Sequence, residues 1–380
     1  MVRPGDDLAE DDERPVLTID LGAIVENWRL LADKARPVEA AASVKADAYG
    51  LGMARVAPAL AAAGARTFFV ATAAEGKALR ALLPAADIYV LNGVAPGGAA
   101  AMVRFCLRPC LCSLAQIELW RDSGGGSPAA LHIDTGINRL GLPPDELAEL
   151  TAAPARLQGI EIALVLSHLA CGDDADHPLN RRQLEDFRRS LAALGLAGRA
   201  VSLSASSGIF LGPEFHLALV RPGASIYGLA PLENNPNPMR QVIRLEGKII
   251  QVRRVDRGMT VGYGATHSVG APGRIAVVGL GYADGFLRAL GNRGYGVLGG
   301  HRIPVVGRVS MDLITLDVSA TPPELAVPGA RVELIGPQHS IDELAAEAGS
   351  IGYELLTALS RRYRRVYIEP VPDAKQESLR

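Results

Sequence analysis

The sequence has no excess of basic residues, because 39 Lys and Arg against 41 Asp and Glu give its 380 residues a net charge of −2. Binding the phosphates of a nucleic acid calls for a clustered excess of Lys and Arg. No apolar run approaches the about 20 residues needed to cross a bilayer. The acidic opening MVRPGDDLAEDDER is the reverse of a basic and hydrophobic secretory signal. These absences argue against nucleic-acid and membrane partners and predict a cytoplasmic protein.

Cysteine is scarce, and the few cysteines do not form a metal-binding pattern. Three of the four, Cys106, Cys110 and Cys112, crowd the segment FCLRPCLC, and Cys171 stands apart. No second Cys/His cluster at the spacing of zinc ligands accompanies them. In a reducing compartment such residues are expected to be buried thiols, so the sequence predicts no metal site.

The length and composition indicate an enzyme of two parts. At 380 residues the chain exceeds one ordinary core, so it needs two domains or a large barrel with an addition. Its 48% hydrophobic and 21% charged residues are typical of a soluble enzyme, and its 41 glycines and 25 prolines supply many turns.

From about Pro15 to Ala230, short apolar runs alternate with helical patterns. Apolar strands that alternate with helices indicate a parallel sheet covered on both faces. A unit of roughly 25 to 30 residues, repeated about eight times, fits a (β/α)8 TIM-type barrel better than an open sheet. The first run, VLTIDL, is surplus, and we assign it to a lead-in strand. The other expected strands are 38–44, 67–72, 87–92, 106–111, 129–134, 160–168, 201–206 and 217–223, and the expected helices include 22–36, 53–64, 73–83, 114–121 and 178–194.

After Met239 the pattern changes to short β runs separated by Gly, Pro and Asp, which predicts an all-β domain. Its runs are 243–255, 259–265, 274–282, 294–318 and 331–336, followed by a helix at 341–348 and a last strand at 365–368. The fold class predicted is therefore α/β, a barrel followed by a C-terminal all-β domain. The expected divisions are a disordered acidic tail at 1–13, the barrel at 14–238, the β domain at 239–373 and a disordered tail at 374–380.

Polar residues end several of the expected barrel strands, and chemistry gathers at the C-terminal ends of such strands. A lysine amine attacks an aldehyde when burial or a neighbouring cation lowers its pKa. A lysine, cations and hydroxyls on one rim would therefore suit an anionic cofactor that bears a carbonyl. The residues are Lys45, Arg139, His168, Ser206, Ser207 and Arg221.

Each of these residues also has a plain structural interpretation. A lone lysine at a strand end usually extends its amine into solvent. Arg139 could pair with Asp134 or Asp145, and His168 could be a core histidine. The turn at 206–208 could simply cap a helix, although such a turn also presents amides suited to phosphate.

Seven motifs, taken together, decide between these interpretations by resemblance. They occur in the same order in the alanine racemases, which depend on pyridoxal 5'-phosphate (PLP), and they span most of the chain. The chain resembles that family, and the resemblance implies a PLP-binding barrel, a C-terminal β domain and interconversion of L-alanine and D-alanine. The motifs are VKADAYGLG (44–52), IDTGINRLGL (133–142), SHLACGDD (167–174), RPGASIYGLAP (221–231), VGYGATHSV (261–269), GYADGF (281–286) and VGRVSMDLITLDV (306–318).

The resemblance implies two catalytic bases. Lys45 matches the lysine that binds the cofactor covalently and serves one face of the substrate, and Tyr263 matches the base on the other face. Racemisation removes the α-proton from one face and returns a proton to the other, so two bases on opposite sides suit it. The family places the tyrosine on the β domain of the partner subunit, which implies a homodimer with shared active sites.

Other positions match residues that bind the cofactor and the substrate. Arg221 matches the arginine at the pyridine nitrogen, where a guanidinium can only donate, and the weaker electron sink favours racemisation over transamination. Arg139 matches the arginine that contacts the cofactor's phenolic oxygen and the substrate carboxylate, and His168 matches a residue near Arg221 and the tyrosine. The remaining matches are the phosphate-binding positions Tyr49, Ser207, Gly223, Ala224 and Tyr353, the substrate-pocket pair Met311 and Asp312, and the access-corridor residues Tyr282, Arg288, Arg308 and Asp173.

One position departs from the pattern of the family. Many relatives have a carbamylated lysine two residues before the aspartate that Asp134 matches, and its carboxylate orients the arginine that Arg139 matches. Here that residue is His132, and an imidazole does not form a stable carbamate. A bound anion such as chloride, a water molecule or His132 itself could orient Arg139, and the sequence does not choose among them.

Three other functions are alternatives to alanine racemisation. A racemase for serine or for a broader set of amino acids differs only in pocket volume, which Met311 and Asp312 indicate to be small. A decarboxylase on a similar plan would pair the pyridine nitrogen with a carboxylate, against the arginine at position 221. A non-catalytic PLP-carrying protein would need only the barrel, against the presence of a β domain with Tyr263. The sequence does not say whether the enzyme serves D-alanine biosynthesis or breakdown.

Overall fold

A computed structural model describes residues 14–370 and divides the chain into two compact units. The barrel unit holds residues 21–240, and the β unit combines residues up to 20 with 241–369. The tails that the sequence predicts at 1–13 and 374–380 lie outside the described residues.

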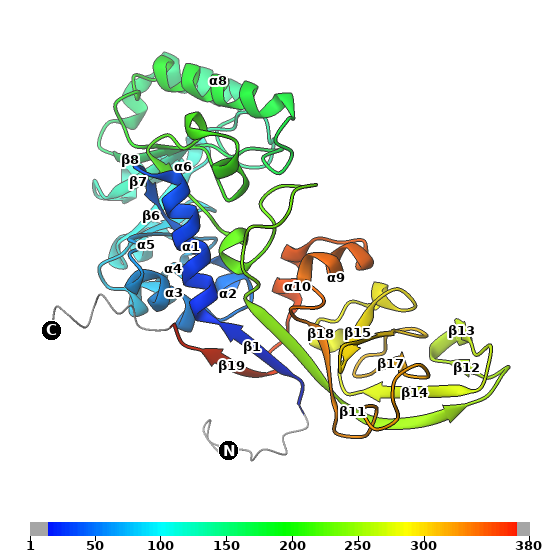
Figure 1. The fold of residues 1–380 in the computed structure, drawn as a ribbon. Coiled ribbons are helices and arrows are strands. Elements are labelled where there is room, and N and C mark those ends of the chain that lie inside the picture. Colours follow the sequence, from blue (N-terminus) through cyan, green and yellow to red (C-terminus); the bar gives the residue numbers. More distant parts are fainter. Residues whose placement is uncertain (1–13, 371–380) are drawn as a thin grey trace. The chain divides into compact units, whose positions relative to one another are not determined.

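The barrel unit is built on parallel strands (Figure 1). In one sheet β3 to β9 pair in sequence order, and in a second sheet β10 pairs with β2. The Ala41 N–H donates to the Val220 carbonyl and the Arg221 N–H to the Ser204 carbonyl, which joins the two sheets into a closed ring. The predicted barrel is thereby confirmed. Its strands are β2 (Glu39–Ala40), β3 (Ala42–Ser43), β4 (Thr67–Val70), β5 (Asp87–Val90), β6 (Leu107–Leu111), β7 (Pro128–His132), β8 (Glu161–Leu166), β9 (Val201–Ser202) and β10 (Leu219–Val220).

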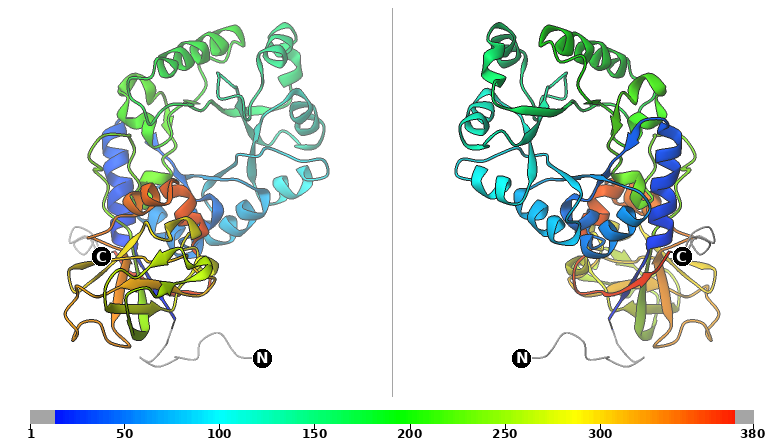
Figure 2. Two further views of the ribbon diagram at one scale, coloured as in Figure 1. Left: turned by 90° about the vertical axis from the view of Figure 1, so that its right-hand side faces the viewer. Right: turned by 90° about the vertical axis from the view of Figure 1, so that its left-hand side faces the viewer.

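Helices surround these strands, as both views of Figure 2 show. The helices predicted from the sequence begin and end within two residues of the expected limits. We did not predict α5, which is too short to show a period, or α7, although Pro144 followed by two acidic residues is a helix-start signal. The helices are α1 (Leu21–Ala35), α2 (Lys45–Tyr49), α3 (Met53–Ala62), α4 (Ala73–Leu82), α5 (Ala99–Arg104), α6 (Leu114–Ser123), α7 (Pro144–Ala152) and α8 (Pro178–Ala193), with 3-10 turns η1 (Pro154–Leu157), η2 (Ser207–Phe210), η3 (Pro213–Phe215) and η4 (Ala224–Tyr227). In the described part of the chain, no helix combines the length and hydropathy that a bilayer crossing demands.

Apolar residues spaced by three and four anchor α1 to the barrel. Ile24, Trp28 and Leu31 are buried on one face of the helix, and each such side chain contributes about 1.5–3 kcal/mol when it leaves water. The Trp28 Nε1–H also donates to the Ala41 carbonyl at 3.1 Å. Helix α1 therefore covers the point where β2 continues into β3.

Side chains fill the inside of the barrel. The rings of Phe69 and Tyr89 stack with their centroids 5.1 Å apart, and they pack with Cys110, Leu166 and Leu219 in one buried cluster. A packed interior resists deformation. It therefore gives the residues at the strand ends a rigid base.

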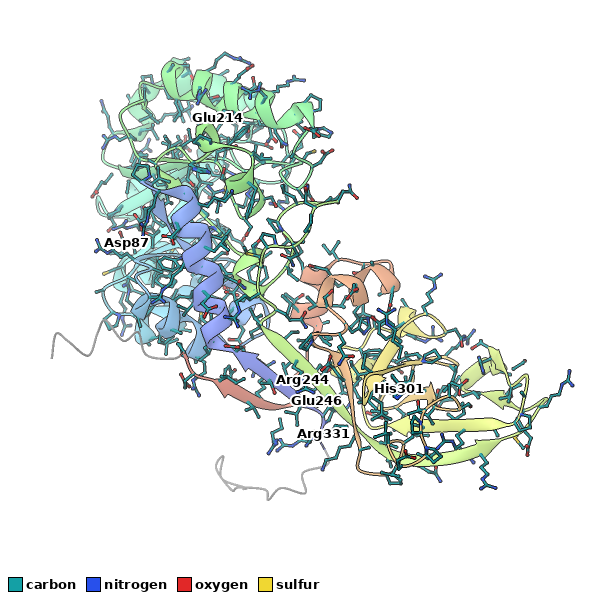
Figure 3. All side chains as sticks on the ribbon, viewed as in Figure 1. Asp87, Glu214, Arg244, Glu246, His301 and Arg331 are labelled. Carbon is teal, nitrogen blue, oxygen red and sulfur yellow. The ribbon has the colours of Figure 1, made fainter. Side chains whose placement is uncertain are left out.

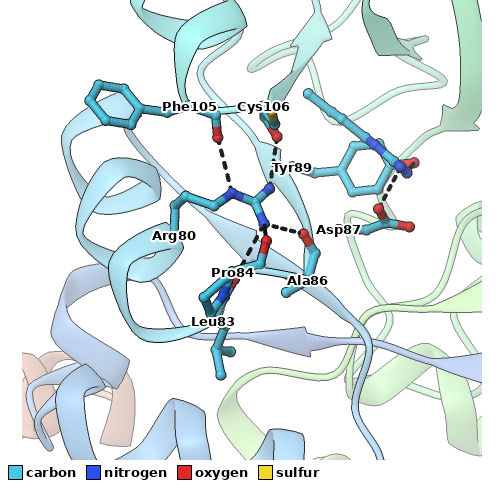
Figure 4. A network of polar contacts seen from close by, with 9 residues as sticks. Arg80, Leu83, Pro84, Ala86, Asp87, Tyr89, Phe105 and Cys106 are labelled. Atoms are coloured by element: carbon cyan, nitrogen blue, oxygen red, sulfur yellow. Dashed lines mark hydrogen bonds and ion pairs between the residues drawn. The ribbon is translucent and has the colours of Figure 1, made fainter.

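One arginine ties the α4–β5 connection to the turn before β6 (Figure 4). A guanidinium has five N–H donors and no acceptor, so it suits a place where several carbonyls are left without partners. Arg80 donates to the carbonyls of Leu83, Pro84, Ala86, Phe105 and Cys106. Beside it, Arg108 donates to the Tyr89 hydroxyl at 3.1 Å and pairs with Asp87 at 2.5 Å. These contacts fix the N-terminal ends of β5 and β6, at the opposite ends of the strands from the candidate site residues.

The β unit is organised around one long strand, β11, which pairs with β1, β14 and β18. Arg244 on β11 forms ion pairs with Glu333 on β18 at 3.0 Å and with Glu246 at 3.1 Å; Figure 3 labels Arg244 and Glu246. The elements are β1 (Val16–Asp20), β11 (Ile243–Val255), β12 (Thr260–Val261), β13 (His267–Ser268), β14 (Gly273–Val278), β15 (Tyr295–Leu298), β16 (His301–Pro304), β17 (Ile314–Asp317), β18 (Arg331–Ile335), β19 (Arg364–Ile368), α9 (Ile341–Ala348) and α10 (Gly352–Ala358), with 3-10 turns η5 (Tyr263–Ala265), η6 (Tyr282–Asp284) and η7 (Arg288–Leu290).

Three details differ from the sequence-based expectations. Strand β1, the expected lead-in strand, pairs antiparallel with β11 and parallel with β19, so it groups with the β unit although we had placed it in the range 14–238. Cys106 is exposed in the turn before β6 and Cys171 is half-buried, whereas Cys110 and Cys112 are buried as expected. Helix α10 was not predicted, because its seven residues are too few to establish a helical period.

Candidate functional site

The carboxyl ends of the barrel strands bring together four of the residues predicted from the sequence. Lys45 follows β3, Arg139 follows β7, His168 follows β8 and Arg221 follows β10. The charges of Arg139 and Arg221 act on Lys45, and all three act on His168. These residues therefore form one cationic cluster. Within residues 14–370, no three His, Cys, Asp or Glu side chains converge to hold a metal ion.

Arg221 is the buried charge of this cluster, with 6% of its surface exposed. Its guanidinium donates to Ser202 Oγ at 2.5 Å and to the Ser167 carbonyl at 2.7 Å, and it lies 5.8 Å above the centre of the Phe69 ring. Burial lowers the pKa of Arg221 to about 10, which leaves it charged at neutral pH. Because an unpaired buried cation costs several kcal/mol, these contacts are what allow the charge to stay inside.

His168 is neutral beside this charge. Burial, and then the charges of Arg221 and Arg139, lower the pKa of His168 to about 3. Arg221 Nη2 lies 3.4 Å from His168 Nδ1. Because a guanidinium can only donate, Nδ1 is the acceptor and the ring proton sits on Nε2. His168 therefore offers one N–H donor, at Nε2, to whatever faces it.

The backbone becomes left-handed directly after Lys45. Residues 46–49 have φ between 53° and 55°, and Gly50 follows at 84°. For L-residues this conformation costs roughly 1–2 kcal/mol each, so contacts outside the turn must stabilise it. Two such contacts are hydrogen bonds from the Ala46 N–H to Glu75 Oε1 at 2.8 Å and from the Met53 N–H to Asp47 Oδ1 at 2.7 Å.

The surroundings of Lys45 favour its neutral amine. Burial first, and then the charge of Arg139, lower the pKa of Lys45 from its usual value; Arg221 adds to the effect, and Glu75 opposes it. The neutral amine is the form that attacks a carbonyl. The lowered pKa is what the nucleophile predicted at Lys45 requires.

One hydroxyl collects two backbone amides after the carboxyl ends of β9 and β10. Ser206 Oγ accepts hydrogen bonds from the N–H groups of Gly223 at 2.9 Å and Ser225 at 3.2 Å. Glycine at position 223 permits a close approach, because a Cβ there would lie 2.4 Å from Tyr49 Oη. The structure therefore brings the predicted phosphate-binding residue Tyr49 against Gly223 and its neighbour Ala224, and Ser207 follows Ser206 in the same turn.

Arg139 is exposed and forms no ion pair among the described residues. The carboxylate of Asp134, one of the two partners considered from the sequence, is used differently. Asp134 Oδ1 accepts hydrogen bonds from the Gly136 N–H at 2.8 Å and the Ile137 N–H at 3.0 Å. Asp134 therefore shapes the turn that carries Arg139.

His132 is buried, with 7% of its surface exposed, and is neutral. Burial, and then the charge of Arg221, lower the pKa of His132 to about 4. Its Nδ1 lies 3.7 Å from Cys112 Sγ, and its Nε2 has no hydrogen-bond partner in the described part of the chain. An uncharged ring thus occupies the position at which the sequence departs from the family pattern.

The remaining predicted site residues belong to the β unit. Tyr263 begins η5 with 72% of its surface exposed, and a Cβ at Gly264 would lie 3.0 Å from Arg308 Nη1, so this turn packs on Arg308. Lys45 and Tyr263 thus stand in different units. Tyr353 is the second residue of α10, and 41% of its surface is exposed. Arg288 is the first residue of η7.

A second arginine joins two predicted substrate-binding segments within the β unit. Arg362 pairs with Asp312 at 2.7 Å and with Asp284 at 3.2 Å. The Tyr282 N–H donates to the Ser310 carbonyl at 3.0 Å. Tyr282 and the pair Met311 and Asp312 are therefore held side by side.

Several residues that support the site were not predicted from the sequence. Gln183 is fully buried on α8, where its amide donates to the His168 carbonyl at 2.9 Å and accepts from the Ala170 N–H at 2.8 Å. The sequence did offer one indication of the role of Gln183, because this polar residue lies on the apolar face of a predicted helix. Ser202, inside an apolar strand, gave a similar one. Glu75 gave none, because it reads as an ordinary helix-capping residue.

Comparisons with known proteins agree over both units. The family profile described as "Alanine racemase, N-terminal domain" matches residues 19–231, and the profile "Alanine racemase, C-terminal domain" matches residues 242–367. The two profiles together cover most of the chain.

Named relatives cover nearly the whole length. A protein of Rhodospirillum rubrum named alanine racemase is 50% identical over 364 residues, which is 94% of this chain and 97% of that protein. One of Agrobacterium fabrum named catabolic alanine racemase is 48% identical, covering 93% of this chain and 92% of that protein. The crystal structure of alanine racemase from Bartonella henselae with covalently bound pyridoxal phosphate has a TM-score of 0.90 at 40% identity, covering 94% of this chain and all of that one.

The two buried imidazoles predict a pH dependence of stability. The folded pKa values of His132 and His168, about 4 and about 3, lie below the usual 6.5. Their contribution to stability is therefore fully present above the unfolded pKa and is lost as the pH falls toward the folded values. Nitrogen NMR of histidine-labelled protein should show both rings neutral at about pH 5.5. Single His→Gln variants assign the signals, and an imidazolium signal from either ring at that pH would contradict the lowered pKa values.

Proposed function

This chain belongs to the alanine racemase family, and from that we propose that it interconverts L-alanine and D-alanine with PLP as its cofactor. The observation that carries the proposal is the position of Lys45, half-buried at the barrel rim with its pKa lowered and Arg221 close enough to act on it. The cytoplasmic location expected from the sequence stays a prediction.

The residues at the rim fit the chemistry of PLP. The cofactor is an anion with an aldehyde and a pyridine nitrogen, so it needs an amine, donors for a phosphate and a polar partner for the ring. Lys45 supplies the amine and Arg221 the ring partner. A Cβ at Gly223 would lie 2.4 Å from Tyr49 Oη, so this hydroxyl lies against the turn that Ser206 holds, and Tyr49 and Ser207 would supply donors for the phosphate. When bound, the cofactor delocalises the electron pair left on the substrate after proton removal.

Arg221 favours racemisation over competing reactions. It is fixed by Ser202, the Ser167 carbonyl and the neutral ring of His168. Because it has donors only, Arg221 would donate to the pyridine nitrogen of a bound cofactor, and the weaker electron sink would disfavour transamination and decarboxylation. Arg139, exposed and without an ion pair in the described residues, is left to bind the substrate carboxylate.

Two bases carry the proton transfer in this proposal. Lys45 removes or returns a proton on one face of the substrate, and Tyr263 acts on the other face. Tyr263 comes from the partner subunit of a homodimer. Its 72% exposure in the single chain, together with the exposure of Met311 and Tyr353, supports a role at a surface that a second chain covers.

The substrate pocket distinguishes alanine from larger amino acids by volume. Met311 and Asp312, held beside Tyr282 by Arg362, bound the side-chain pocket in this proposal. A racemase for serine or for a broader set would tolerate an added hydroxyl or methylene, which is worth only about 1–3 kcal/mol. Rates measured across L-alanine, L-serine and larger L-amino acids decide this point.

The assignment of Lys45 predicts a yellow protein whose cofactor becomes permanently attached on treatment with borohydride. Peptide mapping should locate the label on Lys45. Lys45→Ala should lose the colour and nearly all activity, whereas Lys34→Ala on α1 should keep both. A label on any other lysine would refute the assignment.

Tyr263→Phe should keep the fold and the colour while the rate falls by at least about 100-fold, the lower end for loss of a general acid or base. The solvent isotope effects for L-to-D and D-to-L conversion should respond differently, because Tyr263 serves only one face. Tyr367→Phe on β19 is the matched control and should change little. Equal responses in the two directions would count against two separate bases.

His132 predicts that activity is insensitive to added bicarbonate, because an imidazole does not form a stable carbamate. His132→Lys should create an amine that adds to carbon dioxide supplied by bicarbonate, forming a carbamate and releasing a proton, and its activity should rise with bicarbonate. Activation of the natural protein by bicarbonate would show instead that a carbamate elsewhere orients Arg139.

A further inference from the structure

Glu75 makes a contact that its place in a helix cap does not require. It occupies the third position of α4, where Thr72 Oγ1 accepts from the Glu75 N–H at 3.3 Å and Glu75 Oε2 accepts from the Thr72 N–H at 3.2 Å. Oε2 also accepts from the Ala71 N–H at 2.7 Å. Oε1, however, reaches 29 residues back along the chain to accept from the Ala46 N–H at 2.8 Å.

The cap of α9 shows what such a glutamate does when it acts on its helix alone. There Glu343 Oε2 accepts from the Ser340 N–H at 2.8 Å and the Ser340 hydroxyl at 2.9 Å, and Ser340 Oγ accepts from the Glu343 N–H at 3.2 Å. That box is complete with Ser340 as the partner. The bond from Ala46 to Glu75 therefore serves something other than α4.

That bond holds the backbone on one side of Lys45. On the other side, the Val44 N–H donates to the Phe69 carbonyl of β4 at 2.9 Å. Within the left-handed turn the Ala48 N–H bonds to the Val44 carbonyl and the Gly50 N–H to the Ala46 carbonyl, so the Ala46 N–H needs a partner from outside. Hydrogen bonds to β4 and to the start of α4 therefore fix the backbone on both sides of Lys45.

Glu75 is also the acid that faces Lys45. The other charged groups that act on the amine are Arg139 after β7 and Arg221 after β10, and the charge of Lys45 in turn acts on the neutral ring of His168 after β8. Both arginines disfavour the protonated amine, and Glu75 favours it. A lysine that both takes up and releases a proton needs these influences to balance near neutral pH.

We propose that Glu75 is a positioning residue for Lys45: its carboxylate fixes the turn that carries the lysine and supplies the negative charge that offsets Arg139 and Arg221. This rests on the proposed role of Lys45. Glu75 itself does not touch the reacting atoms.

The test measures the lysine directly in the full-length protein after its cofactor has been removed with hydroxylamine. Acetylation of Lys45 by a limiting amount of acetic anhydride, followed by mass spectrometry of its peptide across a pH series, gives the midpoint at which the amine becomes reactive. The rate at which added PLP restores the yellow colour measures the position of the amine. The variants are Glu75→Gln, Glu75→Asp and the capping control Glu343→Gln.

Glu75→Gln removes the charge and can no longer accept on both sides, so its midpoint should fall by about half a pH unit or more. It should also take up PLP several-fold more slowly. Glu75→Asp keeps the charge on a shorter side chain, so its midpoint should stay at the natural value while PLP uptake still slows. Glu343→Gln should lower the melting temperature through the loss of its own helix cap, without changing the reactivity midpoint of Lys45 or the rate of PLP uptake.

A midpoint and an uptake rate in Glu75→Gln equal to those of Glu343→Gln would overturn the proposal. Should Glu75→Gln fail to fold, an unslowed uptake of PLP by Glu75→Asp would overturn the positioning role. The borohydride label keeps this result separate from the proposed function. If the label lies on Lys45 and Glu75→Gln behaves naturally, only the role of Glu75 fails. If the label lies elsewhere, the role of Lys45 fails as well.

Discussion

The buried guanidinium of Arg221 is the constraint on which the barrel rim depends. A cation held away from water is stable only when donors find acceptors in fixed places, since an unpaired one costs several kcal/mol. Its partners come from different strands: the Ser167 carbonyl follows β8, Ser202 ends β9, and the Phe69 ring on β4 lies beneath it. Strands far apart in the sequence must therefore end at one level. The same charge lowers the pKa of His132 and His168 and favours the neutral amine of Lys45.

The lysine is fixed by a different means, a backbone conformation that its own residues disfavour. Residues 46–49 are not glycines, yet all have positive φ. The strain is tolerated because hydrogen bonds from β4, α3 and α4 hold the turn at both ends. Local sequence preference yields here to tertiary contacts, which is common where a side chain must be aimed accurately. The rim thus combines one buried charge with one strained turn, and each is stabilised by partners at the ends of neighbouring strands.

The sequence was sufficient for the barrel and for the residues that end its strands, because apolar runs and helical spacing report burial directly. It did not predict that β1 pairs with β11 and β19, since the residues of a short apolar strand do not indicate which strand it pairs with. It also could not reveal Ser202, Gln183 or Glu75 as supports of the site. Their roles arise from contacts between residues distant in the sequence, and a capping glutamate looks the same in α4 as in α9. Arg139 and Asp134 show the same limit, because sequence proximity suggested a pair where Asp134 instead accepts backbone amides.

The pairing of β1 makes the β unit discontinuous, with the whole barrel inserted between its first strand and the rest. During synthesis the ribosome releases β1 first, then the barrel, and only afterwards β11, which β1 must meet. A chain paused after Arg240 would carry a complete barrel sequence and one strand without its partners. That strand is five residues long and ends in Asp20, and short edges with a charge resist improper pairing. Strand β19 emerges after β11 and also pairs with β1, so the sheet is complete only after β19 has left the ribosome.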